Sequence, residues 1–143
     1  MRETTRPKPL LIGALSSHSG VNVETIRYYE RAGLLPVAPR TEGGQRSYRE
    51  DHVQRLTFIR RSRELGFSLD EVRQLLRLHD RGARMCCSEA KQLTVQHLTN
   101  VRAKIASLRK LERVLSQMAA SCQPGQQVPC PILVALTAPA RAR

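Results

Sequence analysis

The sequence predicts a mainly α-helical protein in which a winged helix-turn-helix domain is followed by a long antiparallel coiled-coil dimerisation helix and a C-terminal metal-binding loop. Three observations predict this fold class. Two short helical patterns flank a Ser-Gly break near the N-terminus, a long amphipathic stretch without Gly or Pro follows residue 87, and all cysteines lie in the C-terminal half. The predicted segments are a disordered tail (1–9), the winged domain (10–80), a linker with the dimerisation helix (81–121), the loop with a short terminal helix (122–136) and a second tail (137–143).

The charge of the chain indicates a polyanionic partner but does not locate the binding face. There are 24 Lys and Arg residues against 12 Asp and Glu residues, which gives a formal net charge of +12. Residues 1–80 hold 14 basic and 10 acidic side chains, whereas residues 81–143 hold 10 and 2. No apolar stretch reaches the roughly 18 residues of a membrane span. We therefore expect a cytoplasmic protein with reduced thiols and no membrane partner.

The first predicted unit is a helix-turn-helix over residues 12–33. Its first helix covers residues 12–18 and is broken by Gly20. Asn22 stands where the N-cap of the second helix belongs, and Gly33 follows the last helical residue as a C′ glycine does. Two helices joined by a short turn with glycine are typical of a DNA-binding helix-turn-helix, whose second helix enters the major groove.

The rest of the N-terminal domain is predicted as a wing and two further helices. Residues 39–48 are short and polar with two central glycines, which favours a small hairpin. A helix then covers residues 50–65 and is ended by a glycine. Ser68 and Glu71 form the capping-box pattern that opens a fourth helix.

Residues 88–120 contain neither Gly nor Pro and form the long predicted helix. Apolar side chains recur in steps of three and four along one face, at Leu98, Val101, Ile105, Leu108, Leu111, Leu115 and Met118. That face is too long to be buried against the N-terminal domain alone, and a two-stranded coiled coil with a second copy of the chain would bury it. A helix lying across its own domain is the alternative. Residues 123–131 are predicted as a loop and residues 132–136 as a last helical turn.

The second helix of the helix-turn-helix would present polar side chains to DNA. If it docks as such motifs do, its exposed residues include Asn22, Thr25, Arg27 and Tyr28. Hydroxyls and a guanidinium on adjacent turns suit phosphate oxygens or base edges. The alternative is that these side chains are simply solvated, as Arg and Tyr on an exposed helix usually are.

Taken together, these segments resemble the MerR family of transcription regulators. Residues 21–35, VNVETIRYYERAGLL, are similar to the family's reading helix and turn. Residues 46–48, RSY, stand where the family has its wing motif R-x-Y, and residues 65–72, LGFSLDEV, resemble the start of its fourth helix. The resemblance continues along the long helix to about Leu136.

The resemblance implies a set of DNA contacts. Arg27 and Tyr28 are expected to contact the DNA backbone and base edges from the second helix. Arg46 and Tyr48 are expected to grip phosphates from the wing, and Arg40 is a further candidate at the start of the wing. A basic run on the third helix is at least as well explained by a solvated face as by DNA contact: Arg60, Arg61 and Arg63.

Three cysteines suggest a metal site shared between two chains. Cys87 comes immediately before the predicted long helix, Cys122 comes immediately after it, and Cys130 lies in the following loop. Along a continuous helix the first two are roughly 50 Å apart, so they cannot share a metal ion within one chain. In an antiparallel dimer, Cys87 of one chain meets Cys122 and Cys130 of the other, which gives two equivalent sites. The alternative is that the cysteines are small buried apolar residues.

The placement of these cysteines resembles the mercury-responsive branch of the MerR family, which has one cysteine before the dimerisation helix, one after it and one before a Pro in the loop. The resemblance implies Hg(II) as effector, bound by Cys87, Cys122 and Cys130, and thiolates select soft metals. The loop has seven residues between Cys122 and Cys130, one fewer than that branch and like the copper branch. The copper branch has Ser at the position of Cys87 and two ligands for Cu(I). Cys86 is a candidate fourth ligand, which would favour Zn(II), Cd(II) or Pb(II).

The resemblance also implies partners and a mechanism. A homodimer would bind double-stranded operator DNA, hold a mercury-resistance promoter silent in the presence of RNA polymerase, and bend and untwist the DNA when metal binds. No enzyme activity is expected. Two other classes are disfavoured. An iron–sulfur redox sensor would need four clustered cysteines, and a thiol-processing enzyme would need a substrate cleft with an acid–base group.

Overall fold

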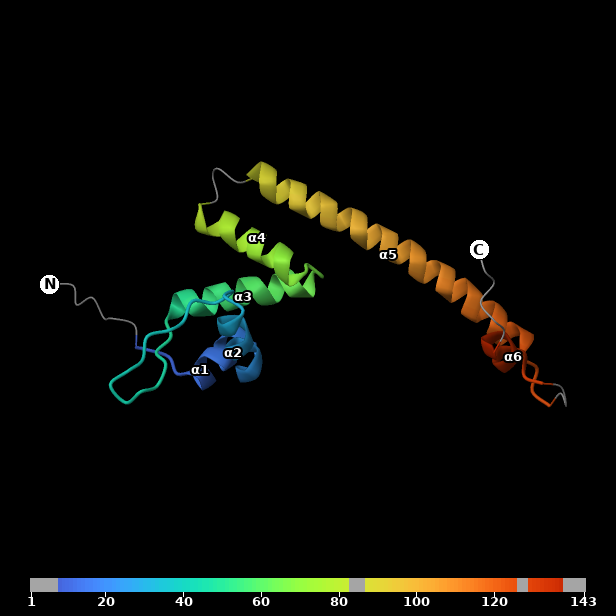
Figure 1. Cartoon of the computed structure of the whole chain (residues 1–143), viewed down its shortest axis with the longest axis horizontal. Helices are drawn as coiled ribbons and strands as arrows, with labels where there is room; N and C mark the ends of the chain where they lie inside the picture. Colours follow the sequence, from blue (N-terminus) through green and yellow to red (C-terminus); the bar gives the residue numbers. More distant parts are fainter. Residues whose placement is uncertain (1–7, 83–86, 126–128, 138–143) are drawn as a thin grey trace. The chain divides into compact units, whose positions relative to one another are not determined.

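The computed structural model describes residues 8–82, 87–125 and 129–137, and these residues are mainly helical. Six helices are described along the chain (Figure 1). The chain divides into two compact units, Met1–Lys91 and Gln92–Arg143. Most of the two predicted tails lies outside the described residues. No helix within the described part combines the length and the apolarity that crossing a membrane requires.

Helices α1 (Ile12–Ser19) and α2 (Val23–Arg31) form the predicted helix-turn-helix. Gly20 ends α1 in the left-handed conformation, with φ 69°, which glycine adopts without steric cost. The side chain of Asn22 accepts a hydrogen bond of 2.8 Å from the backbone N–H of Thr25, so Asn22 is the predicted N-cap. The boundaries predicted for both helices agree with the structure to within about a residue.

The wing between α2 and α3 is a small turn held by backbone hydrogen bonds. Within the described residues it contains isolated bridges and no full strand: Arg40–Arg46 closes the turn, and Leu10–Tyr48 fastens its base to the segment before α1. The N–H groups of Leu10 and Tyr48 each donate to the other's carbonyl at 2.8 Å. Gly44 has φ 78° within the turn. The hairpin predicted from the two central glycines is thus present in a minimal form.

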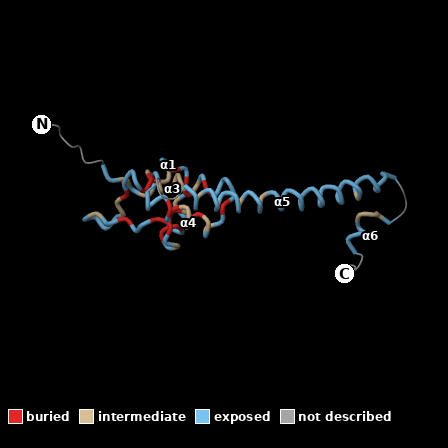
Figure 2. The backbone as a smooth tube through the Cα atoms, turned by 90° about the horizontal axis from the view of Figure 1, so that it is seen from above, coloured by how far each residue is buried: buried red, intermediate tan, exposed pale blue. Residues whose placement is uncertain are grey.

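Helices α3 (Glu50–Glu64) and α4 (Leu69–Asp80) complete the N-terminal unit. Ser68 and Glu71 form the predicted capping box, because the Ser68 Oγ accepts from the Glu71 N–H and the Glu71 carboxylate accepts from the Ser68 N–H. Apolar side chains from all four helices and from the α2–α3 connection build one core, and its residues are among those coloured red in Figure 2. Its fully buried members include Leu15, Ile26, Leu34, Leu35, Tyr48, Leu56, Ile59 and Val72.

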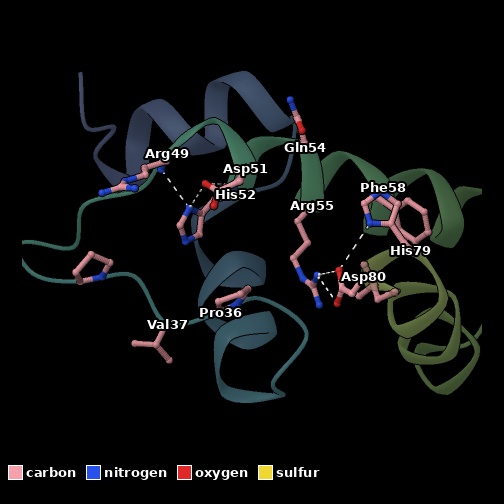
Figure 3. A pocket seen from close by; sticks show the side chains of 12 residues that line it. Pro36, Val37, Arg49, Asp51, His52, Gln54, Arg55, Phe58, His79 and Asp80 are labelled. Atoms are coloured by element: carbon pink, nitrogen blue, oxygen red, sulfur yellow. Dashed lines mark hydrogen bonds and ion pairs between the residues drawn. The ribbon is translucent and has the colours of Figure 1, made fainter. Parts of the chain in front are cut away.

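Arg55 on α3 braces this unit through contacts with two other segments. Its Nη1 donates to both carboxylate oxygens of Asp80 at the end of α4, at 2.9 and 3.1 Å, and its Nε donates to the Leu34 carbonyl at 2.8 Å. Arg55 and Asp80 line a cavity of about 610 Å³ and point toward each other in Figure 3. Hydrogen bonds between charged groups are stronger than neutral ones. The end of α4 and the segment after α2 are therefore both fastened to α3.

Helix α5 (Cys87–Ser121) is continuous over 35 residues, and α6 (Pro131–Thr137) follows it. None of the described residues of α5 and α6 is buried within the single chain, and α5 is pale blue along most of its length in Figure 2. The predicted apolar face is solvent-exposed: Leu98 is 43% accessible, and Leu108 and Leu115 are each 63% accessible. Because burial of apolar surface is favourable, α5 carries a face that a single chain leaves without a partner.

Candidate DNA-binding face and cysteine site

Two of the predicted DNA contacts on α2 point into solvent. The side chain of Arg27 is 53% exposed, and its guanidinium pairs with the carboxylate of Glu24 at 2.9 Å. Tyr28 is 45% exposed, and its ring centroid lies 5.8 Å from that of Tyr29. An exposed ion pair contributes little to stability. Arg27 can therefore exchange Glu24 for a phosphate oxygen or a base edge with little loss of folding free energy.

Asn22 and Thr25 lie at the start of α2, where the fold already uses part of their polar groups. The side-chain oxygen of Asn22 accepts from the Thr25 N–H, and Thr25 itself is half-buried. The cap uses only the oxygen of Asn22, and the residue is exposed, so its amide nitrogen is a donor at the surface.

Arg40 and Arg46 are held by the wing itself. The Nη1 of Arg40 donates to the Gly44 carbonyl at 2.9 Å, and the Nη1 of Arg46 donates to the Ala38 carbonyl at 3.4 Å. The Nε of Arg46 also lies 3.4 Å from the carboxylate of Glu30 on α2, whose side chain is only 5% exposed. The wing is therefore tied to α2 through a buried carboxylate, while Arg40 stays exposed.

Tyr48 is buried, which corrects the expectation that it grips a phosphate. The residue is 0% exposed, and its hydroxyl donates to Glu30 Oε1 at 3.0 Å. Its ring meets the imidazole of His52 edge-on, with the ring centroids 5.4 Å apart. A buried tyrosine usually finds a partner for its hydroxyl, and here the partner is the carboxylate that also pairs with Arg46. Tyr48 acts from inside the fold, by positioning the wing against α2.

This environment raises the pKa of Tyr48 from 10.0 to about 12. Burial disfavours the charged phenolate, and the hydrogen bond to Glu30 and the negative charge of Glu30 act in the same direction. The positive charges of Arg46 and Arg27 lower the pKa, by less. Tyr48 is consequently a hydrogen-bond donor at neutral pH.

Sequence reasoning missed the structural role of Glu30, which joins α2 to the wing. An acidic residue on an amphipathic helix is normally exposed to solvent. Two signals pointed to it: Glu30 lies four positions after Ile26, on the core-facing side of α2, and the wing supplies both an arginine and a tyrosine as donors. A buried charge needs such partners.

The basic run on α3 makes contacts within the fold. The Nη1 of Arg63 donates to a backbone carbonyl of the α3–α4 turn at 2.6 Å, and the Nη1 of Arg60 pairs with Glu64 at 3.5 Å. The Arg60 guanidinium also lies against Gly20, where an added Cβ would be 3.3 Å from Nη1. These contacts give Arg60 and Arg63 structural roles.

The three predicted ligands flank α5. Cys87 is the first residue of α5 and Cys122 is the first residue after it, and both are exposed. Cys130 is half-buried and immediately precedes α6. All three are free thiols. Cys86, the candidate extra ligand, lies outside the described residues.

Cys122 and Cys130 interact with each other beyond the end of α5. The negative charge of Cys130 raises the pKa of Cys122, and the thiol of Cys122 donates a hydrogen bond to the sulfur of Cys130. The backbone N–H groups of Leu133 and Ile132 lower the pKa of Cys130. Of the two sulfur atoms, Cys130 is therefore the one that ionises first.

A single chain provides two of the three predicted ligands at one place. Within the described residues, no group of three or more His, Cys, Asp or Glu side chains lies close enough to hold a metal ion. Because α5 is continuous over 35 residues, its ends are about 50 Å apart. One end carries the thiol pair and the other end carries Cys87.

Two family models match this chain. A model described as the MerR HTH family regulatory protein matches residues 10–78, and one described as MerR, DNA binding matches residues 53–118. The mercuric resistance operon regulatory protein of Serratia marcescens is 44% identical over 128 residues, which cover 89% of this chain and 87% of that protein.

Solved structures with the same fold include two metal complexes. A lead(II) complex of a transcription regulator from Ralstonia metallidurans is 44% identical, with a TM-score of 0.76, and the match covers 89% of this chain and 98% of that one. A mercury(II) complex of the dual function transcriptional regulator MerR from Bacillus megaterium is 35% identical, with a TM-score of 0.67 and the same two coverages, 89% and 98%. These relatives are transcription regulators and not enzymes, as the sequence predicted. Because the two family models match residues 10–78 and 53–118, and because relatives of 44% identity match 89% of its length, the chain belongs to the MerR family of DNA-binding transcription regulators.

Proposed function

We propose that this protein is a cytoplasmic, homodimeric regulator that binds operator DNA and senses Hg(II), thereby controlling a mercury-resistance operon. The observation that carries the proposal is the placement of the cysteines. Cys122 and Cys130 form a thiol pair just beyond one end of the uninterrupted α5, and Cys87 stands at the other end.

DNA binding is assigned to α2 and the wing. Arg27 and Tyr28 are exposed on α2 and would contact the backbone and base edges in the major groove. Asn22 and Thr25 would add contacts at the start of that helix. The two wing arginines would neutralise phosphates beside it, and each neutralised phosphate makes binding more dependent on salt.

The dimer is proposed to form along α5 with its two helices antiparallel. The exposed apolar face of α5 has the spacing that knobs-into-holes packing uses. Two chains that run in opposite directions place Cys87 of one beside Cys122 and Cys130 of the other. Each dimer then holds two sites, and each site has three sulfur ligands from two chains.

Three thiolates suit a soft ion such as Hg(II). The names of the relatives support this choice, since one is a mercuric resistance regulator and another is a mercury(II) complex. Pb(II) is the second candidate, because a lead(II)-bound regulator is 44% identical to this chain. Zn(II) and Cd(II) would favour a fourth ligand, for which Cys86 is the candidate, and linear Cu(I) needs only two.

Regulation would follow from two arrangements of the dimer that differ in their affinity for metal. When Cys87 joins the thiol pair of the partner chain, both ends of the paired helices become fixed. The two reading helices then take new positions on the operator, and the promoter DNA bends and untwists so that RNA polymerase can use it. The protein deforms DNA and performs no chemistry on it.

A mixed-dimer titration tests the cross-chain site. Chains with Cys87→Ser or with Cys122→Ser should each lose the ultraviolet charge-transfer band of a three-thiolate Hg(II) site. In a heterodimer of the two variants, the intact Cys87 of one chain meets the intact Cys122 and Cys130 of the other. One complete site is restored, so part of the band should return on mixing.

The matched control mixes Cys122→Ser with Cys130→Ser. Cys122 and Cys130 belong to the thiol pair that one chain contributes to a site. In a heterodimer of these two variants each thiol pair lacks one cysteine, so neither site has three cysteines and no band should return. Equal spectra from the two mixtures would rule out the cross-chain site. A reporter exposed to Hg, Pb, Cd, Zn and Cu salts then tests the metal, and a strongest response to Pb(II) would move the assignment to the second candidate.

A further inference from the structure

Cys122 and Cys130 are in contact although seven residues separate them in the sequence. The thiol of Cys122 donates a hydrogen bond to the sulfur of Cys130, and both residues are free cysteines. Cys122 is exposed and Cys130 is half-buried, so a small molecule in solvent can reach the thiol pair. Two reachable thiols in contact are the reactants from which a disulfide bond forms. The thiol pair is therefore open to oxidation as well as to metal.

The ends of the two neighbouring helices position this thiol pair. At the end of α5 the N–H of Cys122 donates to the Ala119 carbonyl at 3.3 Å, and at the start of α6 the N–H of Val134 donates to the Cys130 carbonyl at 3.0 Å. The turn that follows α5 contains Gly125, whose φ of 90° is in the left-handed region that glycine favours. The fold has thus already closed the loop between the two cysteines, and little chain entropy is left to lose when a disulfide forms.

We propose that a hydroperoxide oxidises Cys122 and Cys130 of the metal-free protein to an intrachain disulfide, and that this disulfide switches metal sensing off until it is reduced. The inference rests on the proposed function, which assigns both residues as ligands of the metal ion. Metal binds to thiolates, and a disulfide has none, so its formation removes two of the three sulfur ligands. Disulfides in a reducing cytosol are mostly transient and regulatory, which agrees with this role. No iron–sulfur cluster takes part, because the sulfur atoms of the thiol pair are themselves oxidised.

One hydroperoxide, ROOH, forms one disulfide. The Cys130 thiolate attacks the terminal oxygen, the O–O bond breaks, and the alkoxide RO⁻ leaves and takes up the proton that Cys130 released. The sulfur of Cys122 then attacks the sulfur of the resulting sulfenic acid, the S–O bond breaks, and hydroxide leaves as water with the proton of the Cys122 thiol. Two thiols lose two electrons, ROOH gains them, and the products are the disulfide, ROH and water. A cellular thiol reverses the oxidation by thiol–disulfide exchange.

The test oxidises metal-free, fully reduced, full-length protein with hydrogen peroxide and digests it with trypsin. Peptide 114–141 contains both cysteines of the thiol pair and no other cysteine. Its mass should fall by two hydrogen atoms, it should no longer react with iodoacetamide, and a phosphine reductant should restore both properties. The oxidised protein should lose the charge-transfer band that Hg(II) gives with the reduced protein. That band should return after the phosphine has been added and removed.

Gly125→Ala tests the position of the thiol pair without removing a ligand. Alanine is strained at φ 90°, so the reduced loop should relax and the two thiols should separate. In buffers of oxidised and reduced glutathione, the equilibrium constant for disulfide formation should then fall several-fold. Gly82→Ala makes the same change at φ 92° outside the loop, and its equilibrium constant should equal that of the unmodified protein. Equal constants for the two variants would overturn the proposal.

Cys87→Ser separates the disulfide from the metal site. This variant lacks the third proposed ligand, yet it should form the disulfide as readily as the unmodified protein, because both oxidised cysteines belong to one chain. The proposal fails if peroxide leaves peptide 114–141 unchanged, if it joins two chains through Cys87 instead, or if the oxidised protein still gives the full Hg(II) band. A reduced protein that forms the disulfide but gives no Hg(II) band would overturn the proposed function itself, and that result is distinct from a thiol pair that does not oxidise.

Discussion

Replacing Tyr48 with phenylalanine removes one hydroxyl from the core and leaves the ring that packs there. The hydroxyl donates to the Glu30 carboxylate at 3.0 Å, and both residues are buried. A hydrogen bond to a charged group contributes about 1.5–3 kcal/mol, and Phe leaves no large cavity. We expect Tyr48→Phe to lower the free energy of unfolding by about 2 kcal/mol at pH 7. The remaining partner of Glu30, Arg46, keeps the carboxylate from being left unpaired.

The same substitution should change the pH dependence of stability. The ordinary pKa of a tyrosine is 10.0, whereas the pKa of Tyr48 in the folded protein is about 12. The Tyr48 hydroxyl therefore stays protonated to a higher pH in the folded state than in the unfolded state. The contribution of Tyr48 is complete below pH 10 and is lost as the pH rises through 12. In that window the free energy of unfolding falls by at most about 1.4 kcal/mol per pH unit from this group. The Phe variant lacks this contribution.

Urea unfolding at a fixed protein concentration measures both effects, because the stability of the proposed dimer would depend on protein concentration. Tyr28→Phe is the matched control, since Tyr28 is exposed, and its free energy of unfolding should change by less than about 0.5 kcal/mol. If Tyr48→Phe unfolds at the same urea concentration as the unmodified protein, or keeps the same slope between pH 10 and 12, the role given to the Glu30–Tyr48 contact is wrong.

Three further predictions concern α2, the proposed coiled coil and the thiol pair. Arg27→Gln should weaken operator binding and flatten its salt slope by about 0.9, whereas Glu24→Gln, which only releases Arg27 from its exposed ion pair, should bind at least as tightly in the same fluorescence titration. Leu108→Glu puts a charge into the exposed apolar face of α5 and should shift the sedimentation coefficient from that of a dimer to that of a monomer. The control variant Lys110→Glu should leave the sedimentation coefficient unchanged. A Leu108→Glu protein that is still a dimer would refute pairing through this face. In metal-free protein at neutral pH, iodoacetamide should alkylate Cys130 before Cys122. The reason is that the N–H groups of Leu133 and Ile132 lower the pKa of Cys130, whereas the charge of Cys130 raises the pKa of Cys122. Mass spectrometry of the peptides measures the order of alkylation, and the opposite order would contradict this prediction.

The helices of the N-terminal unit were predictable because single residues mark their ends. Asn22 caps α2, the Ser68–Glu71 pair opens α4, and Gly20 stops α1, and each acts through hydrogen bonds to residues a few positions away. Local signals of this kind can be recognised in a sequence without any structure. The long α5 was equally clear, since nothing in it interrupts the helix.

The contacts within the winged domain were less predictable, because they join residues far apart in the sequence. The resemblance of residues 46–48 to the family's wing motif implied that Tyr48 grips a phosphate, yet Tyr48 lies in the core and its hydroxyl donates to Glu30, eighteen positions away. The period of α2 places Glu30 on the core-facing side, but it does not indicate that the partner of Glu30 is a tyrosine eighteen positions away. The metal site has the same difficulty between chains, since Cys87 has its proposed partners in another molecule.

The carboxylate of Glu30 contacts Tyr48 and Arg46 at the same time, so it helps to set the spacing between α2 and the wing in the absence of DNA. If α2 and the wing both contact the operator as proposed, the DNA has to fit this spacing. Operator sequences that narrow or twist easily would then be preferred, also at base pairs that no side chain touches.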